Sequence, residues 1–345
     1  MDRDKIEQQY LKVTKIFANL AGTWPYQRPL SKLIIIIISS LITIPAIYTQ
    51  IAYIALVREL DVLMEEFPFI AVGMGILVKQ TNSFIYGSRL KLLLDGMYED
   101  WTVNKSKEEI VIMKTYAERA TYFTSFYAIT AIFTTVFFIN MPLKSRILDK
   151  LIPLNESRDP LYMYEPYYGW DEEKYFYVTV THMSIFVILI LFVFTAVDTI
   201  FIYFVQHACG LLEVSGHRFK HAIEDFSSCE KKIMDPPQEL SIMEINGDTE
   251  CCFHCVFLFV QLMHMFFTVL QGQFVINAID DVYDHIYEAL WYNVPPKTQA
   301  LYLLALRRTL TPPEISAAGV VTFNLQSFSA IIKTSVSYFM VLKNT

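Results

Sequence analysis

The strongest constraint in this sequence is a set of long runs that contain no Asp, Glu, Lys or Arg. Leu33–Val57 holds 25 such residues, and Cys251–Ile279 holds 29. A helix rises about 1.5 Å per residue, so about 20 apolar residues cross the roughly 30 Å hydrocarbon core of a bilayer. Only 18% of the residues are charged, whereas a soluble domain has about 25%. The chain is therefore expected to be an all-α polytopic protein of the lipid bilayer.

Six segments are expected to form membrane-spanning helices. They are Leu33–Val57, Phe67–Gly87, Ala120–Leu143, Tyr175–Val197, Cys251–Ile279 and Ile315–Thr345. Phe67–Gly87 is the weakest of them, because its later half holds Lys79 and four consecutive polar residues. Pro45 is expected to kink the first span, and apolar helix is expected to continue after the fourth span to Leu212.

The orientation follows from the basic residues beside the spans. Residues 1–32 contain six Lys or Arg, Arg58–Glu66 contains one, and Ser88–Arg119 contains six. Basic residues concentrate on the cytoplasmic side of membrane proteins. The N-terminus is therefore expected in the cytoplasm and the loop Lys144–Lys174 outside, where Asn155 in an Asn-x-Ser sequon is a candidate for glycosylation.

Two motifs have residue types and spacings that could suit a metal ion. His217 and His221 lie one helical turn apart and would face the same way, but iron oxygenases of membranes need several such pairs, and the other five histidines form none. Residues 251–255 contain Cys-x-x-Cys and a histidine, without a second pair of ligands at zinc-site spacing. We expect no enzyme activity, no metal, no cofactor and, without a basic stripe, no nucleic-acid partner.

The last segment, Ile315–Thr345, is apolar enough to span a bilayer, yet Ser, Thr, Asn and Gln recur through it. A helix that only faced lipid would not need these groups, whereas a helix that lines a wet path would. Lys333 either extends to the membrane interface or lies beside that path. Asp198 either lies inside the membrane or marks the cytoplasmic end of the fourth span.

The C-terminal region resembles the insect odorant receptor family. The residues that carry the resemblance are Tyr287–Tyr292, Lys297–Gln299, Arg307-Arg308, Pro313, Ser316–Gly319, Phe328 and Lys333–Leu342, together with Asp198 and His207–Leu212 in the fourth span. Such receptors are seven-helix, ligand-gated cation channels with the N-terminus inside, in which odour-tuning subunits assemble with a shared odorant co-receptor into tetramers. The resemblance implies a multi-pass protein of the plasma membrane of sensory neuron dendrites.

The resemblance also implies roles for particular residues. One transmembrane domain would comprise ligand-binding and anchor helices in residues 1–287 and an anchor helix with the pore-lining helix in residues 288–345. Val341, in the Tyr338–Leu342 ending, would form an apolar gate, and Asn344 would follow it at the outer mouth of the pore. Lys333 would lie near the conduction path.

Small volatile ligands would bind between helices in the outer half of the membrane. Aromatic and Met side chains of the outer halves of the spans are the pocket candidates, although each could simply pack between helices. They are Phe69, Ile70, Met74, Phe133, Phe137, Tyr177, Met183, Phe186, Phe259 and Met263.

The chain departs from the family pattern in its number of spans, six instead of seven. The position of the fifth helix is filled by Glu213–Glu250, which is polar and contains Pro236-Pro237. Either that helix is missing or Ala222–Ile245 replaces it. If it is missing, strict alternation would invert the last two spans and place Arg307 and Arg308 outside.

Three alternatives to an odorant receptor channel remain. A truncated, non-conducting odorant receptor follows if the fifth helix is absent. A gustatory-type receptor channel is close in class, but its ending usually has a Gln a few residues after the Tyr, and none follows Tyr338. A G-protein-coupled receptor is disfavoured by the cytoplasmic N-terminus and by the absence of an extracellular cysteine pair.

Overall fold

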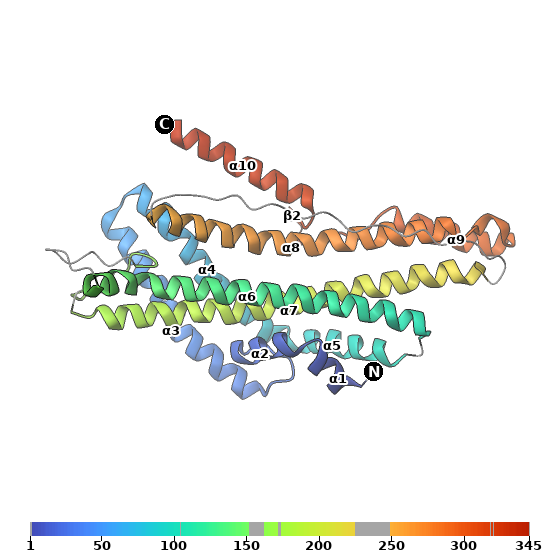
Figure 1. Cartoon of the computed structure of the whole chain (residues 1–345), viewed down its shortest axis with the longest axis horizontal. Helices are drawn as coiled ribbons and strands as arrows, with labels where there is room; N and C mark the ends of the chain where they lie inside the picture. Colours follow the sequence, from blue (N-terminus) through green and yellow to red (C-terminus); the bar gives the residue numbers. More distant parts are fainter. Residues whose placement is uncertain are drawn as a thin grey trace. The chain divides into compact units, whose positions relative to one another are not determined.

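The computed structural model describes residues 2–103, 105–151, 162–171, 174–224, 249–317, 319 and 321–344. Its elements in chain order are α1 (Arg3–Gln9), α2 (Lys12–Ala21), α3 (Pro29–Val57), α4 (Leu60–Ile85), α5 (Gly87–Thr102), α6 (Lys107–Leu151), α7 (Phe176–Glu224), α8 (Thr249–Glu288), a 3₁₀ turn η1 (Trp291–Asn293), α9 (Pro296–Thr309), β1 (Ser316–Ala317), β2 (Val321–Thr322) and α10 (Leu325–Asn344) (Figure 1). The expectation of an all-α membrane protein is confirmed.

Four helical segments within the described ranges are long and apolar enough to cross a membrane. They are Pro29–Val57, Lys107–Lys144, Phe176–Ala222 and Leu258–Asn293. α4 covers most of the weaker span expected at Phe67–Gly87. α7 continues without interruption past Leu212, as expected. α6 is also one continuous helix, so the charged residues before the third span belong to the same helix as that span.

The last expected span begins later than the sequence indicated. β1 and β2 pair in an antiparallel ladder, in which Ser316 pairs with Thr322 and Ala317 with Val321. Gly319 has a φ of +72°, a backbone conformation that glycine adopts without steric cost. α10 therefore starts only at Leu325, and the expected helix from Ile315 is corrected to this shorter one.

The chain divides into two compact units. The first comprises residues 1–104 and 118–203, and the second comprises 105–117 and 204–345. α6 and α7 each contribute to both. In the first unit, the N-terminal helices α1 and α2 pack against α5. Glu7, which is 7% exposed, accepts hydrogen bonds from Arg3 and Lys15 of these N-terminal helices and from Tyr98 on α5. The N-terminal helices are thus a packed part of the first unit.

Local sequence explains where several helices begin and end. α3 has Pro29 in its first turn, where the missing N–H costs no hydrogen bond. α2 ends at Gly22 with a φ of +72°, a common left-handed cap. Ser106 and Glu109 form a reciprocal capping box at the start of α6, with backbone to side-chain distances of 2.9 and 3.1 Å.

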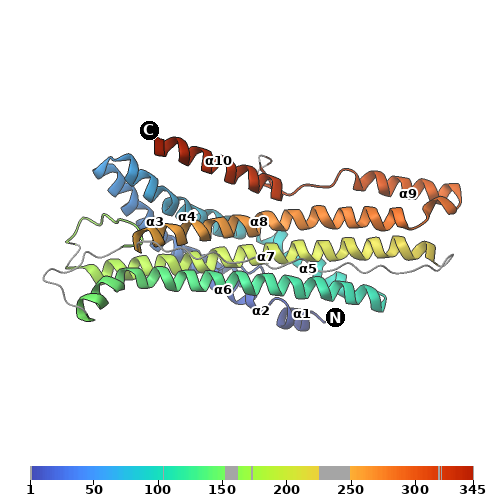
Figure 2. The same ribbon diagram turned by 45° about the horizontal axis from the view of Figure 1, so that its top comes forward.

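In the second unit, α7 and α8 run in the same direction. Gln206 contacts Gln271 at 3.3 Å, and Lys220 forms an ion pair with Glu288 at 3.3 Å. The two helices are therefore parallel, and their C-terminal ends lie side by side, as both views show (Figures 1 and 2). The candidate replacement for a fifth helix lies, from residue 225 onward, outside the described residues.

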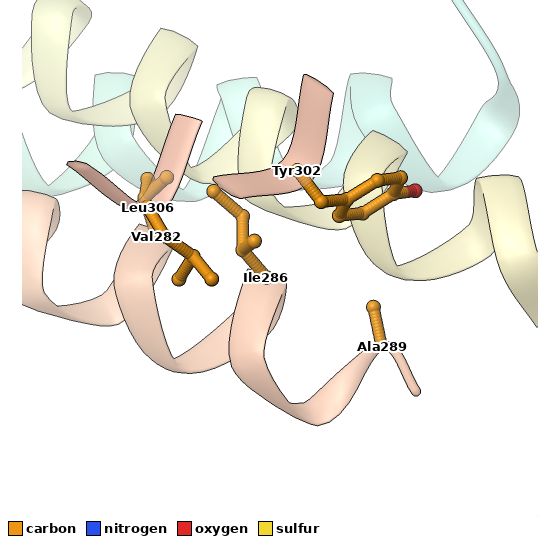
Figure 3. Close-up of a cluster of buried hydrophobic side chains, with 5 residues drawn as sticks. All are labelled: Val282, Ile286, Ala289, Tyr302 and Leu306. Carbon is orange, nitrogen blue, oxygen red and sulfur yellow. The ribbon is translucent and has the colours of Figure 1, made fainter. Parts of the chain in front are cut away.

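An apolar cluster joins α8 to α9 at this end. Val282, Ile286, Ala289, Tyr302 and Leu306 are each less than 10% exposed (Figure 3). The Tyr302 hydroxyl donates to the Phe219 carbonyl at 3.1 Å, which ties α9 to the end of α7. Arg307 and Arg308, in the last turn of α9, therefore belong to the same end of the second unit as the C-terminus of α7. The inversion expected from strict alternation is not what the structure shows.

Candidate functional site

The first unit has an apolar interior between α3, α4 and α7. Ile76, Met183 and Phe186 are completely buried. The helices approach closely because α4 has Gly73 at the contact: a Cβ there would lie 2.9 Å from Ile47 and 3.4 Å from Phe186. Two of the predicted pocket residues, Met183 and Phe186, thus lie in one tightly packed region.

A loop closes this interior. Tyr162, Met163 and Tyr164 lie outside any helix, yet each is less than 10% exposed. The Tyr164 ring packs against Phe69, with centroids 5.8 Å apart, and edge-on against Phe186 at 6.1 Å. The loop before α7 therefore supplies Tyr164, which was not predicted, and this ring contacts two predicted pocket residues, Phe69 and Phe186. The run of aromatics from 162 to 170 was the available signal.

The same place carries buried polar groups. Gln50 on α3, Glu66 on α4 and Tyr164 are 0%, 3% and 4% exposed. One Glu66 oxygen accepts from the Glu165 backbone N–H at 2.7 Å. The Tyr164 hydroxyl interacts with the side chains of Gln50 and Tyr168, whereas the other Glu66 oxygen has no hydrogen-bond partner among the described residues. An unpaired buried polar atom costs about 1–3 kcal/mol, so this group favours a hydrogen-bonding guest.

Glu66 is also perturbed electrostatically. It precedes the expected second span, and burial disfavours its charged form strongly enough to raise its pKa to about 7, despite the hydrogen bond from Glu165. A carboxyl group with this pKa is largely protonated in mildly acidic solution and can then donate a hydrogen bond.

A second polar group links loop and bundle. The ring of His182 on α7 lies 3.2 Å, through Nε2, from the Ile42 carbonyl and 2.6 Å, through Nδ1, from the Tyr168 hydroxyl. A carbonyl only accepts, so Nε2 carries the proton and Nδ1 accepts from Tyr168. The loop is therefore fixed to α7 by a specific hydrogen bond as well as by aromatic packing.

Farther along α7, Asp198 is paired within the bundle. Its carboxylate lies 2.5 Å from Lys79 Nζ on α4 and accepts from the Tyr127 hydroxyl on α6 at 2.7 Å. Lys79 also lies over the Phe194 ring, 4.4 Å from its centroid. Asp198 therefore bonds α7 to α4 and α6 within the first unit, and its depth in the membrane stays a prediction. The charge of Lys79 in the second expected span and the charge of Asp198 after the fourth therefore neutralise each other.

The other predicted pocket residues are spread more widely. Phe69, Ile70 and Phe137 are half-buried, whereas Met74, Phe133 and Tyr177 are 50%, 72% and 70% exposed. In the second unit, Phe259 is 53% exposed and Met263 is half-buried. The structure therefore brings Phe69 and Phe186 together around Tyr164, buries Met183 elsewhere on α7, and leaves three candidates on the outer surface of the first unit.

The predicted pore residues lie on α10. Tyr338 and Val341 are 69% and 59% exposed, and Lys333 is exposed as well. Ala330, Ile331, Thr334, Ser335 and Tyr338 line a shallow groove along this helix. The side chain of Asn344 and the glycosylation candidate Asn155 lie outside the described part of the chain.

α10 is attached to α8 through a close joint. Phe328 packs edge-on against Phe266, with centroids 5.6 Å apart, and the Leu325 N–H donates to Gln273 Oε1 at 3.2 Å. Gly272 makes the approach possible, since a Cβ there would lie 1.8 Å from the Phe323 carbonyl oxygen. The helix with the predicted gate is therefore joined directly to a long apolar helix.

Comparison with known proteins agrees with this architecture. A family model described as 7tm odorant receptor matches residues 59–241 and 238–336. Among solved structures, the insect olfactory receptor OR5 from Machilis hrabei in complex with eugenol is similar over 100% of both chains, with a TM-score of 0.79 and 11% identity. A second structure of the same receptor, OR5 from Machilis hrabei, is similar over 97% of both chains, with a TM-score of 0.75 and 12% identity. Comparison with curated protein sequences gives no match. The family match spans most of the chain, and the protein is thus a member of the odorant receptor family, whose members are receptors and not enzymes.

Proposed function

We propose that this chain is an odour-tuning subunit of a ligand-gated, non-selective cation channel that assembles with the odorant co-receptor in a heterotetramer. The observation that carries the proposal is the apolar interior of the first unit, closed by Tyr164, in a chain of this family. Binding sites for small molecules are mostly apolar with a few well-placed polar groups. The interior has that composition.

The ligands are small volatile molecules with one hydrogen-bonding group. Their apolar part would pack against Phe69, Met183 and Phe186, and their polar group would meet Gln50 and Glu66. The similar OR5 structure is a complex with eugenol, a small volatile phenol. Eugenol and related phenols are therefore the first probes to apply to this chain.

Conduction is assigned to α10. Its exposed face carries hydroxyl groups together with apolar side chains, a composition suited to a pore wall. A ring of apolar side chains can keep a pore dry until the helices move apart. In this proposal, Val341 supplies that ring, Tyr338 and Lys333 line the path, and Asn344 follows at the outer mouth.

The orientation proposed is N-terminus in the cytoplasm, in the plasma membrane of sensory neurons. Basic residues support it, because Arg218 and Lys220 near the end of α7 lie at the same end of the second unit as Arg307 and Arg308 on α9. Clustered basic residues are typical of the cytoplasmic side.

The test is co-expression with the odorant co-receptor and recording of odour-evoked current while G-protein signalling is blocked. We expect a current that Phe186→Ala weakens and that Phe133→Ala leaves intact, because Phe186 is completely buried and Phe133 is 72% exposed. No current from any ligand, with no protein at the cell surface, would favour the truncated, non-conducting variant. Current from non-volatile tastants without the co-receptor would favour a gustatory-type channel.

A further inference from the structure

The histidine pair on α7 acquires a third ligand in the folded chain. His217 and His221 lie one turn apart with ring centroids 4.0 Å apart. His217 Nε2 lies 3.2 Å from Oε2 of Glu108, which belongs to the first turn of α6. One ligand atom from each of the three side chains lies within 4.8 Å of the other two. All three residues belong to the second unit.

These distances suit a transition-metal ion. Zinc bonds of 2.0–2.1 Å at tetrahedral angles place neighbouring ligand atoms about 3.4 Å apart. The separation between His217 and Glu108 is already close to that value, and a small rotation would bring His221 to it. Two imidazoles and one carboxylate form a common zinc set that leaves a position for water. Calcium and magnesium prefer oxygen ligands, so the two nitrogen donors select against them.

The surrounding contacts hold the ligands in place. Arg218, next to His217, makes two hydrogen bonds to Glu109, next to Glu108, at 2.6 and 3.2 Å. Glu109 is itself fixed in the capping box with Ser106. The first turn of α6 is therefore held against α7 before any metal binds. Side-chain exposures of 72% for Glu108 and 22% for His217 leave the group open to ions from solution.

We propose that His217, His221 and Glu108 bind one zinc-class transition-metal ion, which fastens the start of α6 to the end of α7. Each imidazole would bind the metal through an unprotonated ring nitrogen. None of the site's residues belongs to the apolar interior of the first unit.

The proposal is tested by titrating zinc into the purified full-length protein in detergent and measuring the heat of binding by calorimetry. Cys251, Cys252 and Cys255 are changed to Ser in every sample, because thiolates are competing zinc ligands. We expect one ion per chain in this background. Co²⁺ as a substitute should give visible absorption with the intensity of a low-symmetry site, and no thiolate band.

Three variants test the ligands, and one serves as the control. Changing the environment of a metal ligand costs about 10–100-fold in affinity, so His217→Ala, His221→Ala and Glu108→Gln should each lose at least about tenfold. His264→Ala, on α8, should bind as the background does. Glu108→Gln is the decisive variant, since this exposed side chain can be changed without affecting folding. No zinc bound by the background, or equal binding by all three variants, overturns the proposal.

Discussion

The joint between α8 and α10 provides the sharpest test of the structure, through Gly272→Ala. The new Cβ would lie 1.8 Å from the Phe323 carbonyl oxygen, and real Cβ atoms essentially never approach another atom within 3.0 Å. The segment before α10 must therefore retreat by at least 1.2 Å, the difference between these distances. A side-chain rotation cannot relieve this overlap, because the opposing atom belongs to the backbone.

The cost can be estimated from the contacts that the retreat disturbs. Overpacking costs about 1–3 kcal/mol, the hydrogen bond from Leu325 to Gln273 about 0.5–1.5 kcal/mol, and the ring contact of Phe328 about 0.5–1.5 kcal/mol. Alanine returns up to about 1 kcal/mol through its higher helix propensity. Together these contributions are expected to weaken the joint by roughly 1–6 kcal/mol, which is at least about fivefold in its closed-to-open equilibrium ratio.

Amide hydrogen exchange at Leu325 measures the joint directly, because this N–H donates to Gln273 Oε1 at 3.2 Å when the joint is closed. With Gly272→Ala, the exchange rate at Leu325 should rise at least about fivefold. Gly96→Ala on α5 is the matched control, since no atom lies within 4 Å of its added Cβ. Unchanged exchange at Leu325 in Gly272→Ala would refute the close approach.

Three further outcomes are expected. Lys79→Met should destabilise the protein by about 3–5 kcal/mol, because it leaves the Asp198 carboxylate without its cation, and adding Asp198→Leu should restore most of the loss. Thermal unfolding of the single and double variants checks this, and equal midpoints would contradict it. Burial raises the Glu66 pKa from about 4.5 to about 7. The contribution of the protonated Glu66 to the free energy of unfolding is therefore fully present below pH 4.5 and is lost as the pH rises through 7, by at most roughly 3 kcal/mol. Glu66→Gln should abolish this part of the pH dependence of the unfolding midpoint between pH 5 and 8. Val341→Ser should raise the basal current of the co-expressed channel if this residue is the gate, and an unchanged leak would remove it from that role.

Much of the helical framework could be predicted from the sequence. Uncharged runs identify α3, α6, α7 and α8, because few other structures place more than about 20 such residues together. Element boundaries were less accessible. The pairing of β1 with β2 interrupts a segment that is apolar enough to span a bilayer, and α10 starts after Asn324, whose Oδ1 accepts from the Ser327 N–H at 2.7 Å.

Contacts between distant residues were the part that the sequence could not supply. Asp198 was recognised as unusual for its place in an apolar helix, but its partner Lys79 lies 119 residues away. Helical spacing aligned His217 with His221, whereas Glu108 joins them only through the packing of α6 on α7. The pairing in each case depends on which helices become neighbours, and local pattern does not encode this.

The position of Tyr164 has a consequence for how such a receptor can diverge. This ring helps to shape the interior, yet it is supplied by a loop rather than by α4 or α7. Helix residues such as Phe186 serve two interactions at once, because they also hold neighbouring helices together. A loop residue can change in size or polarity while those helix contacts persist, so ligand preference could evolve at this position with little effect on assembly. Variation within a set of related receptors should accordingly be greater at position 164 than at position 186.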